Sequence, residues 1–227
     1  RCFFGYHILR RIINNEQLII ENVDVGKITK TKCGICYMKN IVFDLGRVVF
    51  AQDPTKSSDE FKQFFSYVSQ TPMPQFWVDY DLGLSSLDKV ATDLAEYRSV
   101  EVAYARDMIL QAIAKQETLA PTHELIKELK ERGYKLYVLS NMSKEYIAFL
   151  RQMDVFQYFE GEVISCETAL IKPEKEIYSL LLERYNLKAE QTIFIDDRRV
   201  NVEAAAELGI VPFHFDRNNP EKSCEQL

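Results

Sequence analysis

The sequence lacks several features that would assign it to a common class. No apolar run approaches the ~18 residues that a membrane-spanning helix needs, so we predict no membrane segment. It has no glycine-rich loop of the Walker or dinucleotide-binding type. Its three histidines, His7, His123 and His214, do not adjoin a nucleophile at a predicted strand end, so a Ser–His–Asp hydrolase is not indicated. The net charge of −6 argues against a nucleic-acid partner, because phosphate neutralisation needs clustered Lys and Arg.

A disulfide pattern is also lacking. Five cysteines, an odd number in 227 residues, do not predict a disulfide framework, and we expect a cytoplasmic protein. Cys33 and Cys36 form a C-G-I-C pair. A tetrahedral zinc site needs four ligands, and no second CxxC or paired histidine follows in the sequence. We interpret the two thiols as incidental.

Residues 1–37 differ from the rest of the chain in hydrophobic pattern and in charge. They show no sustained hydrophobic period, and the first 39 residues hold seven Lys and Arg against three Asp and Glu. Met38 stands immediately before the first clear strand. We hypothesise that Met38 is the natural start and that residues 1–37 are an extension of the reading frame. The alternative is a genuine amino-terminal strand and helix that pack on the core.

From Met38 onward, short apolar strands alternate with helical patterns. The predicted strands are Ile41–Phe43, Lys135–Leu139, Glu162–Ser165, Thr192–Ile195 and Val211–Phe215. Helix signals follow most of them: Thr122 and Ser143 as caps, Pro173 as a first-turn proline, and Gly209 after the last helix. This alternation predicts an α/β fold, a Rossmann-like doubly wound parallel sheet with helices on both faces.

One interval breaks the alternation. Residues 53–121 show helical stretches and no convincing strand, which predicts a small helical cap domain inserted after the first strand. The core domain then comprises residues 38–52 and 122–227. The cap would lie at the carboxyl ends of the strands, where open α/β sheets bind ligands. Its aromatic residues Phe76, Trp77 and Tyr80 are either the core of this domain or part of a substrate wall.

Polar residues stand at the ends of four of the predicted strands or in the loops that follow these strands. The set comprises Asp44, Ser140-Asn141, Lys172-Pro173 and Asp196-Asp197. Adjacent carboxylates repel each other unless a cation or a proton intervenes, and hard oxygen ligands suit Mg²⁺. Together these residues supply a nucleophile, a hydroxyl, a cation and a magnesium site, as phosphoryl transfer through an aspartyl-phosphate requires.

Four segments give the sequence a family resemblance. "FDLGRVV", "VLSNMS", "IKPEKEIY" and "FIDDRRVNVEAAAELGI" resemble the four motifs of haloacid dehalogenase-like (HAD) hydrolases, in the family's order and spacing. The resemblance covers Met38 to about Phe215. The "DLG" and "IDD" forms resemble the branch with bacterial α-D-glucose-1-phosphate phosphatase and the phosphatase half of soluble epoxide hydrolases.

The resemblance implies a role for each matching residue. Asp44 would be the nucleophile, and Lys172 would neutralise charge between it and the phosphate. Ser140 and Asn141 would also bind the phosphate. Mg²⁺ would be held by Asp44, the Gly46 carbonyl, Asp196 and Asp197, with Asn201 supporting their loop. We therefore predict a Mg²⁺-dependent phosphatase, a monomer or homodimer, whose partner is a small phosphorylated metabolite such as a sugar phosphate.

Gly46 departs from the family pattern. Most phosphatases of this family carry a second Asp there, which protonates the leaving alkoxide. Asp53, the next acidic residue, is either a replacement acid or a linker cap. The alternative function is a catalytically weak phosphate-binding or regulatory protein. Motif order argues strongly against a signalling receiver domain, because receivers carry the acidic pair on the first strand.

Overall fold

The computed structural model describes residues 7–14, 17–24, 38–70 and 72–227. Strands β1 (His7–Asn14) and β2 (Gln17–Asp24) pair antiparallel in a two-stranded sheet of their own. The C-G-I-C pair at Cys33 and Cys36 lies outside the described residues, as do residues 25–37 that precede Met38. The start at Met38 therefore stays a hypothesis.

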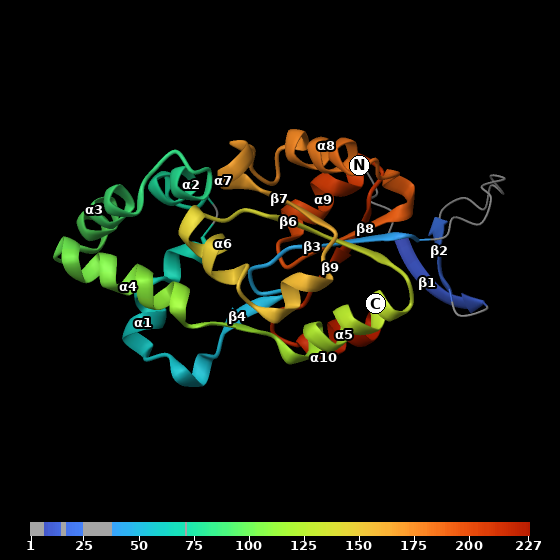
Figure 1. Ribbon diagram of the computed structural model, residues 1–227, viewed down its shortest axis with the longest axis horizontal. Coiled ribbons are helices and arrows are strands. Elements are labelled where there is room, and N and C mark those ends of the chain that lie inside the picture. Colours follow the sequence, from blue (N-terminus) through green and yellow to red (C-terminus); the bar gives the residue numbers. More distant parts are fainter. Residues whose placement is uncertain (1–6, 15–16, 25–37, 71) are drawn as a thin grey trace, which may run out of the picture.

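A five-stranded parallel sheet forms the centre of the molecule, as predicted (Figure 1). Its strand order is β7-β6-β3-β8-β9, so the first strand of the sheet in sequence, β3, lies between β6 and β8. The strands are β3 (Asn40–Phe43), β6 (Lys135–Ser140), β7 (Gly161–Ile164), β8 (Thr192–Asp196) and β9 (Val211–His214). Each of the five predicted strands is confirmed to within one residue at either end.

Alternation along each strand divides the core between the two faces of the sheet. Ile41 and Phe43 pack with helices on one face, while Val42 between them packs on the other. The first face is covered by α5 (Ala120–Glu131), α6 (Lys144–Leu150) and α10 (Pro220–Gln226). The second face is covered by α8 (Lys175–Arg184) and α9 (Arg199–Glu207). Helices on both faces confirm the doubly wound arrangement (Figure 1).

Short elements complete the core connections. They are the one-turn helix α7 (Ser165–Thr168) and the 3₁₀ turns η3 (Asp154–Tyr158) and η4 (Ala189–Gln191). Two helix starts differ from the prediction. Thr122 lies inside α5, where its hydroxyl donates to the Val48 carbonyl at 2.7 Å. Pro173 precedes α8, whose cap position is Glu174. Thr122 therefore joins a helix to the turn after Asp44 instead of capping that helix.

The segment between β4 (Phe50–Gln52) and β5 (Gln116–Thr118) is mostly helical. It contains η1 (Pro54–Lys56), α1 (Asp59–Phe64), η2 (Ser66–Ser69), α2 (Gln75–Asp81), α3 (Leu87–Arg98) and α4 (Val102–Ala114). A hydrophobic cluster separate from the two core clusters lies inside it. The expectation of no strand here was wrong at β5, which pairs antiparallel with β4 and closes the base of the segment.

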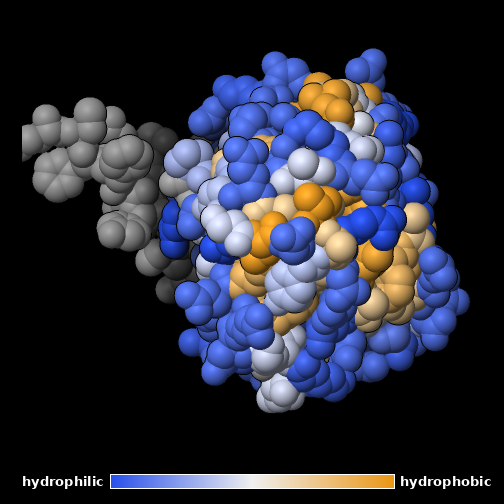
Figure 2. All heavy atoms as spheres, turned by 90° about the vertical axis from the view of Figure 1, so that its left-hand side faces the viewer, coloured by the Kyte–Doolittle hydropathy of each residue, from blue (hydrophilic) through white to orange (hydrophobic). Residues whose placement is uncertain are grey.

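Viewed from the end formed by this helical segment, the surface is mostly hydrophilic, with apolar patches among the polar side chains (Figure 2). The large apolar side chains exposed on the segment are Leu84, Tyr97, Val102, Tyr104 and Leu110. Among the described residues, no helix is both long enough and apolar enough to cross a membrane.

Candidate active site

Asp44 directly follows β3, and its position is fixed by backbone and side-chain contacts. Its N–H donates to the Ile195 carbonyl at 2.8 Å, which holds it beside the end of β8. Its Oδ1 accepts from the Ser140 hydroxyl at 2.8 Å and lies 2.9 Å from the Lys172 ammonium. Asp44 is 8% exposed. Burial raises the pKa of its carboxyl and the Asp196 charge adds to this, while Lys172 opposes both.

Lys172 is the buried cation that joins two of the carboxylates. Its Nζ lies 2.7 Å from Asp196 Oδ2 and also donates to the Leu139 carbonyl at 2.9 Å. Burial acts to lower the pKa of this ammonium, but the charges of Asp196 and Asp44 together outweigh it and raise the pKa. Lys172 is therefore a fixed positive charge between Asp44 and Asp196.

Asn141 and Lys172 are joined by a reciprocal pair of hydrogen bonds. The Asn141 amide donates to the Lys172 carbonyl at 2.9 Å, and the Lys172 N–H donates to Asn141 Oδ1 at 2.8 Å. The loop after β6 is thereby tied to the loop that carries Lys172. These two segments lie 31 residues apart in the chain.

Asp196 and Asp197 have different environments. Asp196 Oδ2 accepts from the Asn201 amide at 2.9 Å, and its Oδ1 accepts from the Arg198 N–H at 2.7 Å. Asp197 Oδ2 pairs with Arg217 at 3.0 Å. Asn201 therefore contacts Asp196 directly and fixes its orientation.

Asp44, Asp196 and Asp197 converge at one point, with one carboxylate oxygen from each within 4.8 Å of the others. Burial raises the pKa of Asp197, and the Asp44 charge adds to this effect. Three carboxylates this close repel one another unless positive charge lies between them. Oxygen donors in this arrangement are the ligands that Mg²⁺ prefers. The donor set therefore fits a magnesium ion.

Gly46 lies in the turn that follows Asp44. The Leu45 carbonyl accepts from the N–H groups of Val49 and Phe50 at 2.9 Å each, which closes this turn. A Cβ placed at Gly46 would meet no atom within 4 Å, so the absence of a side chain here is not forced by packing. Asp53 was considered as a replacement for the acid missing at Gly46 or as a linker cap. It caps η1 by accepting from the Thr55 N–H at 2.8 Å, so the linker-cap interpretation is confirmed.

Two neighbouring cavities open beside Asp44, with volumes of about 510 and 420 Å³. The larger is lined by Asp44, Lys172 and Asp197 from the core and by Trp77 and Asp81 from the helical segment. The smaller is more apolar. Residues that line both cavities are Gly46, Arg47, Val68, Ser69, Trp77, Asp81 and Asn141. Of the three aromatics singled out in the sequence, Trp77 alone lines these cavities.

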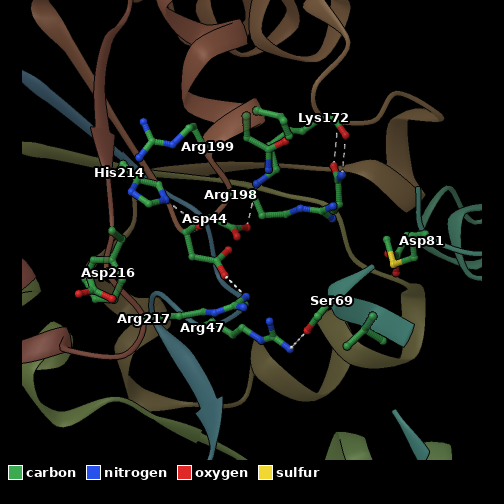
Figure 3. Close-up of a pocket in the computed structure, with 18 of the residues that line it drawn as sticks. Asp44, Arg47, Ser69, Asp81, Lys172, Arg198, Arg199, His214, Asp216 and Arg217 are labelled. Atoms are coloured by element: carbon green, nitrogen blue, oxygen red, sulfur yellow. Dashed lines mark hydrogen bonds and ion pairs between the residues drawn. The ribbon is translucent and has the colours of Figure 1, made fainter. Parts of the chain in front are cut away.

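Arginines surround the larger cavity (Figure 3). Arg47, Arg198, Arg199 and Arg217 all line it. Arg47 also reaches the helical segment, where its Nη2 donates to Ser69 Oγ at 3.0 Å. Burial lowers the pKa of the Arg47 guanidinium, and the charges of Arg217 and Arg198 add to this effect. The cavity therefore presents four guanidinium groups beside its carboxylates, and such groups can pair with an anionic ligand.

The family model of haloacid dehalogenase-like hydrolases matches residues 38–209. The chain belongs to the HAD-like hydrolases. The match runs from two residues before β3 to two residues after α9. It includes the predicted site residues Asp44, Ser140, Asn141, Lys172, Asp196 and Asp197. This HAD-like chain is accordingly an enzyme, a hydrolase with phosphatase relatives.

Two curated relatives are phosphatases. The chain is 25% identical over 179 residues to a sesquiterpene phosphatase of Aspergillus oryzae, covering 78% of this chain and 89% of the relative. It is 34% identical over 88 residues to a phosphorylated carbohydrates phosphatase of Thermotoga maritima, covering 38% and 41%. These relatives support membership among the HAD-family phosphatases, whereas the narrower branch resemblance stays a prediction.

A solved structure supports the fold. A HAD family enzyme of Bacteroides thetaiotaomicron, in complex with magnesium and inorganic phosphate, matches with a TM-score of 0.63 and 24% identity. The match covers 79% of this chain and 95% of that chain. At this identity the likeness shows the shared fold alone.

The structure brings all the strand-end residues of the sequence prediction to one edge of the sheet. Arg47, Asp81 and Arg217 also line this site but were not among the predicted site residues. Arg217 follows β9 closely, and so carried the same strand-end signal as the others. Arg47, in the turn three residues after Asp44, carried this signal too. Asp81 carried none, because the last residue of a short helix reaches the site only through tertiary packing.

Proposed function

We propose that this HAD-like hydrolase is a Mg²⁺-dependent phosphatase that cleaves a small phosphomonoester through an aspartyl-phosphate on Asp44. The observation that carries the proposal is the convergence of Asp44, Asp196 and Asp197 beside a cavity, with Lys172 in contact with two of them.

Asp44 is the nucleophile in this proposal because its carboxylate is held at the cavity wall and is oriented by two donors. Its oxygen attacks phosphorus, the bond to the ester oxygen breaks, and the alcohol leaves with a proton. Water then hydrolyses the aspartyl-phosphate and releases inorganic phosphate. Lys172 reduces the repulsion between the Asp44 carboxylate and the phosphate dianion, because it lies 2.9 Å from Asp44 Oδ1.

Other polar groups bind the phosphate in this proposal. The Ser140 hydroxyl, which donates to Asp44 in this structure, can turn to a phosphoryl oxygen. The Asn141 backbone N–H supplies a further donor. Asp44, Asp196, Asp197 and the Gly46 carbonyl would hold Mg²⁺, which supplies positive charge against the developing negative charge on the phosphoryl group.

The helical segment serves as the cap in this proposal. It supplies Trp77 and Asp81 to both cavities, while the core supplies Asp44 and Lys172 to the larger one. The arginines favour an anionic substrate, and the apolar wall of the smaller cavity accommodates the rest of the molecule. The substrate is therefore a small phosphorylated metabolite, a class that includes the phosphorylated carbohydrates named for the Thermotoga maritima relative.

A panel of phosphomonoesters assayed with and without Mg²⁺ tests the proposal. We expect Asp44→Asn to abolish turnover and chelation to do the same. A phosphate adduct on Asp44 should be recovered by mass spectrometry after acid quench of the native enzyme. Asp53→Asn, an equal charge change at the capped linker, serves as the matched control and should retain turnover.

Turnover that survives Asp44→Asn would contradict the mechanism. If phosphate analogues bind but no ester is cleaved, the catalytically weak binding protein is the better description. Equilibrium binding of vanadate or inorganic phosphate, measured beside the assays, separates these two outcomes.

A further inference from the structure

The missing side chain at Gly46 leaves the proposed reaction without an obvious proton donor, and Asp81 lies where such a donor is needed. Asp81 is the last residue of α2 and lines both cavities. The residue is 9% exposed. In Figure 3 it lies on the helical-segment side of the cavity, across from Asp44 on the core side.

The Asp81 carboxylate differs from the other acidic groups at the site. Asp44, Asp196 and Asp197 each accept hydrogen bonds or ion pairs from named partners. Among the described residues, no hydrogen bond or salt bridge reaches the carboxylate of Asp81. A buried, unpartnered carboxyl group that faces a cavity is costly, and it is available to a ligand that enters the cavity.

The backbone of Asp81 is held to the catalytic loops. Its carbonyl accepts from the Ser165 hydroxyl. The same Ser165 oxygen accepts from the Met142 N–H at 2.8 Å, and Met142 directly follows Asn141. Asp81 is thus attached to the loop after β6, so its position relative to Asn141 is fixed even though it belongs to the helical segment.

The electrostatic surroundings favour the acid form of Asp81. Burial raises its pKa to about 7, the Arg198 charge opposes this, and the Asp44 charge adds to it. The other titratable groups that interact with Asp81 are the phenols of Tyr67 and Tyr146 and the thiol of Cys166, each of which has a raised pKa and is uncharged at neutral pH. A pKa near the working pH suits a group that must both donate and accept a proton.

We infer that Asp81 is the general acid of this enzyme and donates a proton to the leaving ester oxygen in place of a side chain at position 46. The inference rests on the proposed phosphatase function. As Asp44 bonds to phosphorus, the bond from phosphorus to the ester oxygen breaks, and the Asp81 proton passes to that oxygen. The Asp81 carboxylate then takes a proton from the water that attacks the aspartyl-phosphate, which frees Asp44 and restores the acid.

The test compares two leaving groups in a single turnover. An alkyl phosphate such as glycerol phosphate needs a proton on its leaving oxygen, whereas p-nitrophenyl phosphate releases a stable phenolate that does not. We expect Asp81→Asn to slow the first-turnover release of glycerol by about 10²–10⁴-fold and to leave that of nitrophenolate far less affected. Asn matches Asp in size, so the variant retains the shape of the side chain.

Asp79→Asn is the matched control, because Asp79 lies on the same helix and its Oδ1 accepts from Gln75 instead of facing the cavities. It should behave like the wild type on both substrates. In the Asp81→Asn background, Gly46→Asp should restore glycerol release, since a side chain at position 46 has room. Such a rescue would not follow if Asp81 had only a structural role.

The pH dependence gives a readout that needs no variant. In the wild type, glycerol release should fall as the pH rises through about 7 and Asp81 loses its proton, while nitrophenolate release should not. The inference would be overturned if Asp81→Asn slowed the release of glycerol and of nitrophenolate equally, or slowed neither. It would also be overturned if both substrates showed the same pH profile in the wild type. The proposed function fails separately, if Asp44→Asn retains turnover of nitrophenyl phosphate.

Discussion

At the scale of single residues, Arg47 has an unfavourable backbone conformation and lies at the candidate active site. Its φ is +62°, in the left-handed region that favours glycine, and this costs a non-glycine residue about 1–2 kcal/mol. Its side chain lines both cavities and contacts Ser69. Strain of this kind at a cavity wall points to selection for function over stability.

Arg47→Gly should therefore stabilise the fold while weakening substrate binding. Relief of the strain exceeds the loss of one exposed hydrogen bond and the added entropy of the unfolded chain, so we expect a gain of up to about 1 kcal/mol in the free energy of unfolding. Urea denaturation measures it, and KM for a phosphomonoester should rise. Arg199→Gly, at another cavity-lining arginine in the first turn of α9, should lose stability instead. A loss in both variants would show that Arg47 is not strained.

The raised pKa of Asp81 also makes the stability of the fold depend on pH, independently of any role in catalysis. Its pKa is raised from 3.8 to about 7, so the folded state binds the proton more tightly than the unfolded state. This contribution is complete below about pH 4 and is lost as the pH rises through about 7. The Asp81→Asn variant has no such loss. Its free energy of unfolding, relative to that of the wild type, should therefore rise by about a few kcal/mol between pH 4 and pH 8.

Thermal unfolding of both proteins at pH 4.5, 6 and 8 measures this difference. Asp79→Asn, the control on the same helix, should track the wild type at every pH. A constant difference between Asp81→Asn and the wild type across the series would mean that the Asp81 carboxyl does not change its charge in this range.

At the scale of elements, the parallel strands were predictable because each is a short run of buried apolar residues bounded by helix signals. The carboxyl ends of such strands meet at one edge of the sheet, so the sequence alone predicted that Asp44, Ser140 and Asp196 lie close together. By contrast, β4 and β5 were missed, since three-residue strands such as Phe50–Gln52 carry too few positions to show a period.

Helix starts were less predictable for a different reason. Thr122 has the chemistry of a cap, but its hydroxyl is buried and satisfies the Val48 carbonyl in the turn after Asp44. The backbone partner lies 74 residues away, so no local pattern can reveal it. The same limit applies to Asp81, whose place at the cavity depends on how α2 packs against the loops of the core.

At the scale of the whole molecule, the site joins segments that span most of the chain from β3 to β9, so a bound ligand stabilises the whole fold. Mg²⁺ should raise the melting temperature, because in the proposed site it binds the converged carboxylates of the folded state and the unfolded chain lacks such a site. At 100 times the dissociation constant the expected gain is about 2.7 kcal/mol. Since the ligands must be ionised and the pKa values of Asp44 and Asp197 are raised, the gain should shrink as the pH falls.

Melting curves over a Mg²⁺ series, with chelator as the zero point, measure this linkage without any substrate. Asp197→Asn removes one ligand and should flatten the response, whereas Asp53→Asn makes the same change of charge at the η1 cap and should leave it unchanged. An equal response in both variants would mean that Mg²⁺ acts on the general surface charge of the chain. A response lost only with Asp197→Asn would localise the ion to the edge of the sheet beside Asp44, where the proposed chemistry requires it.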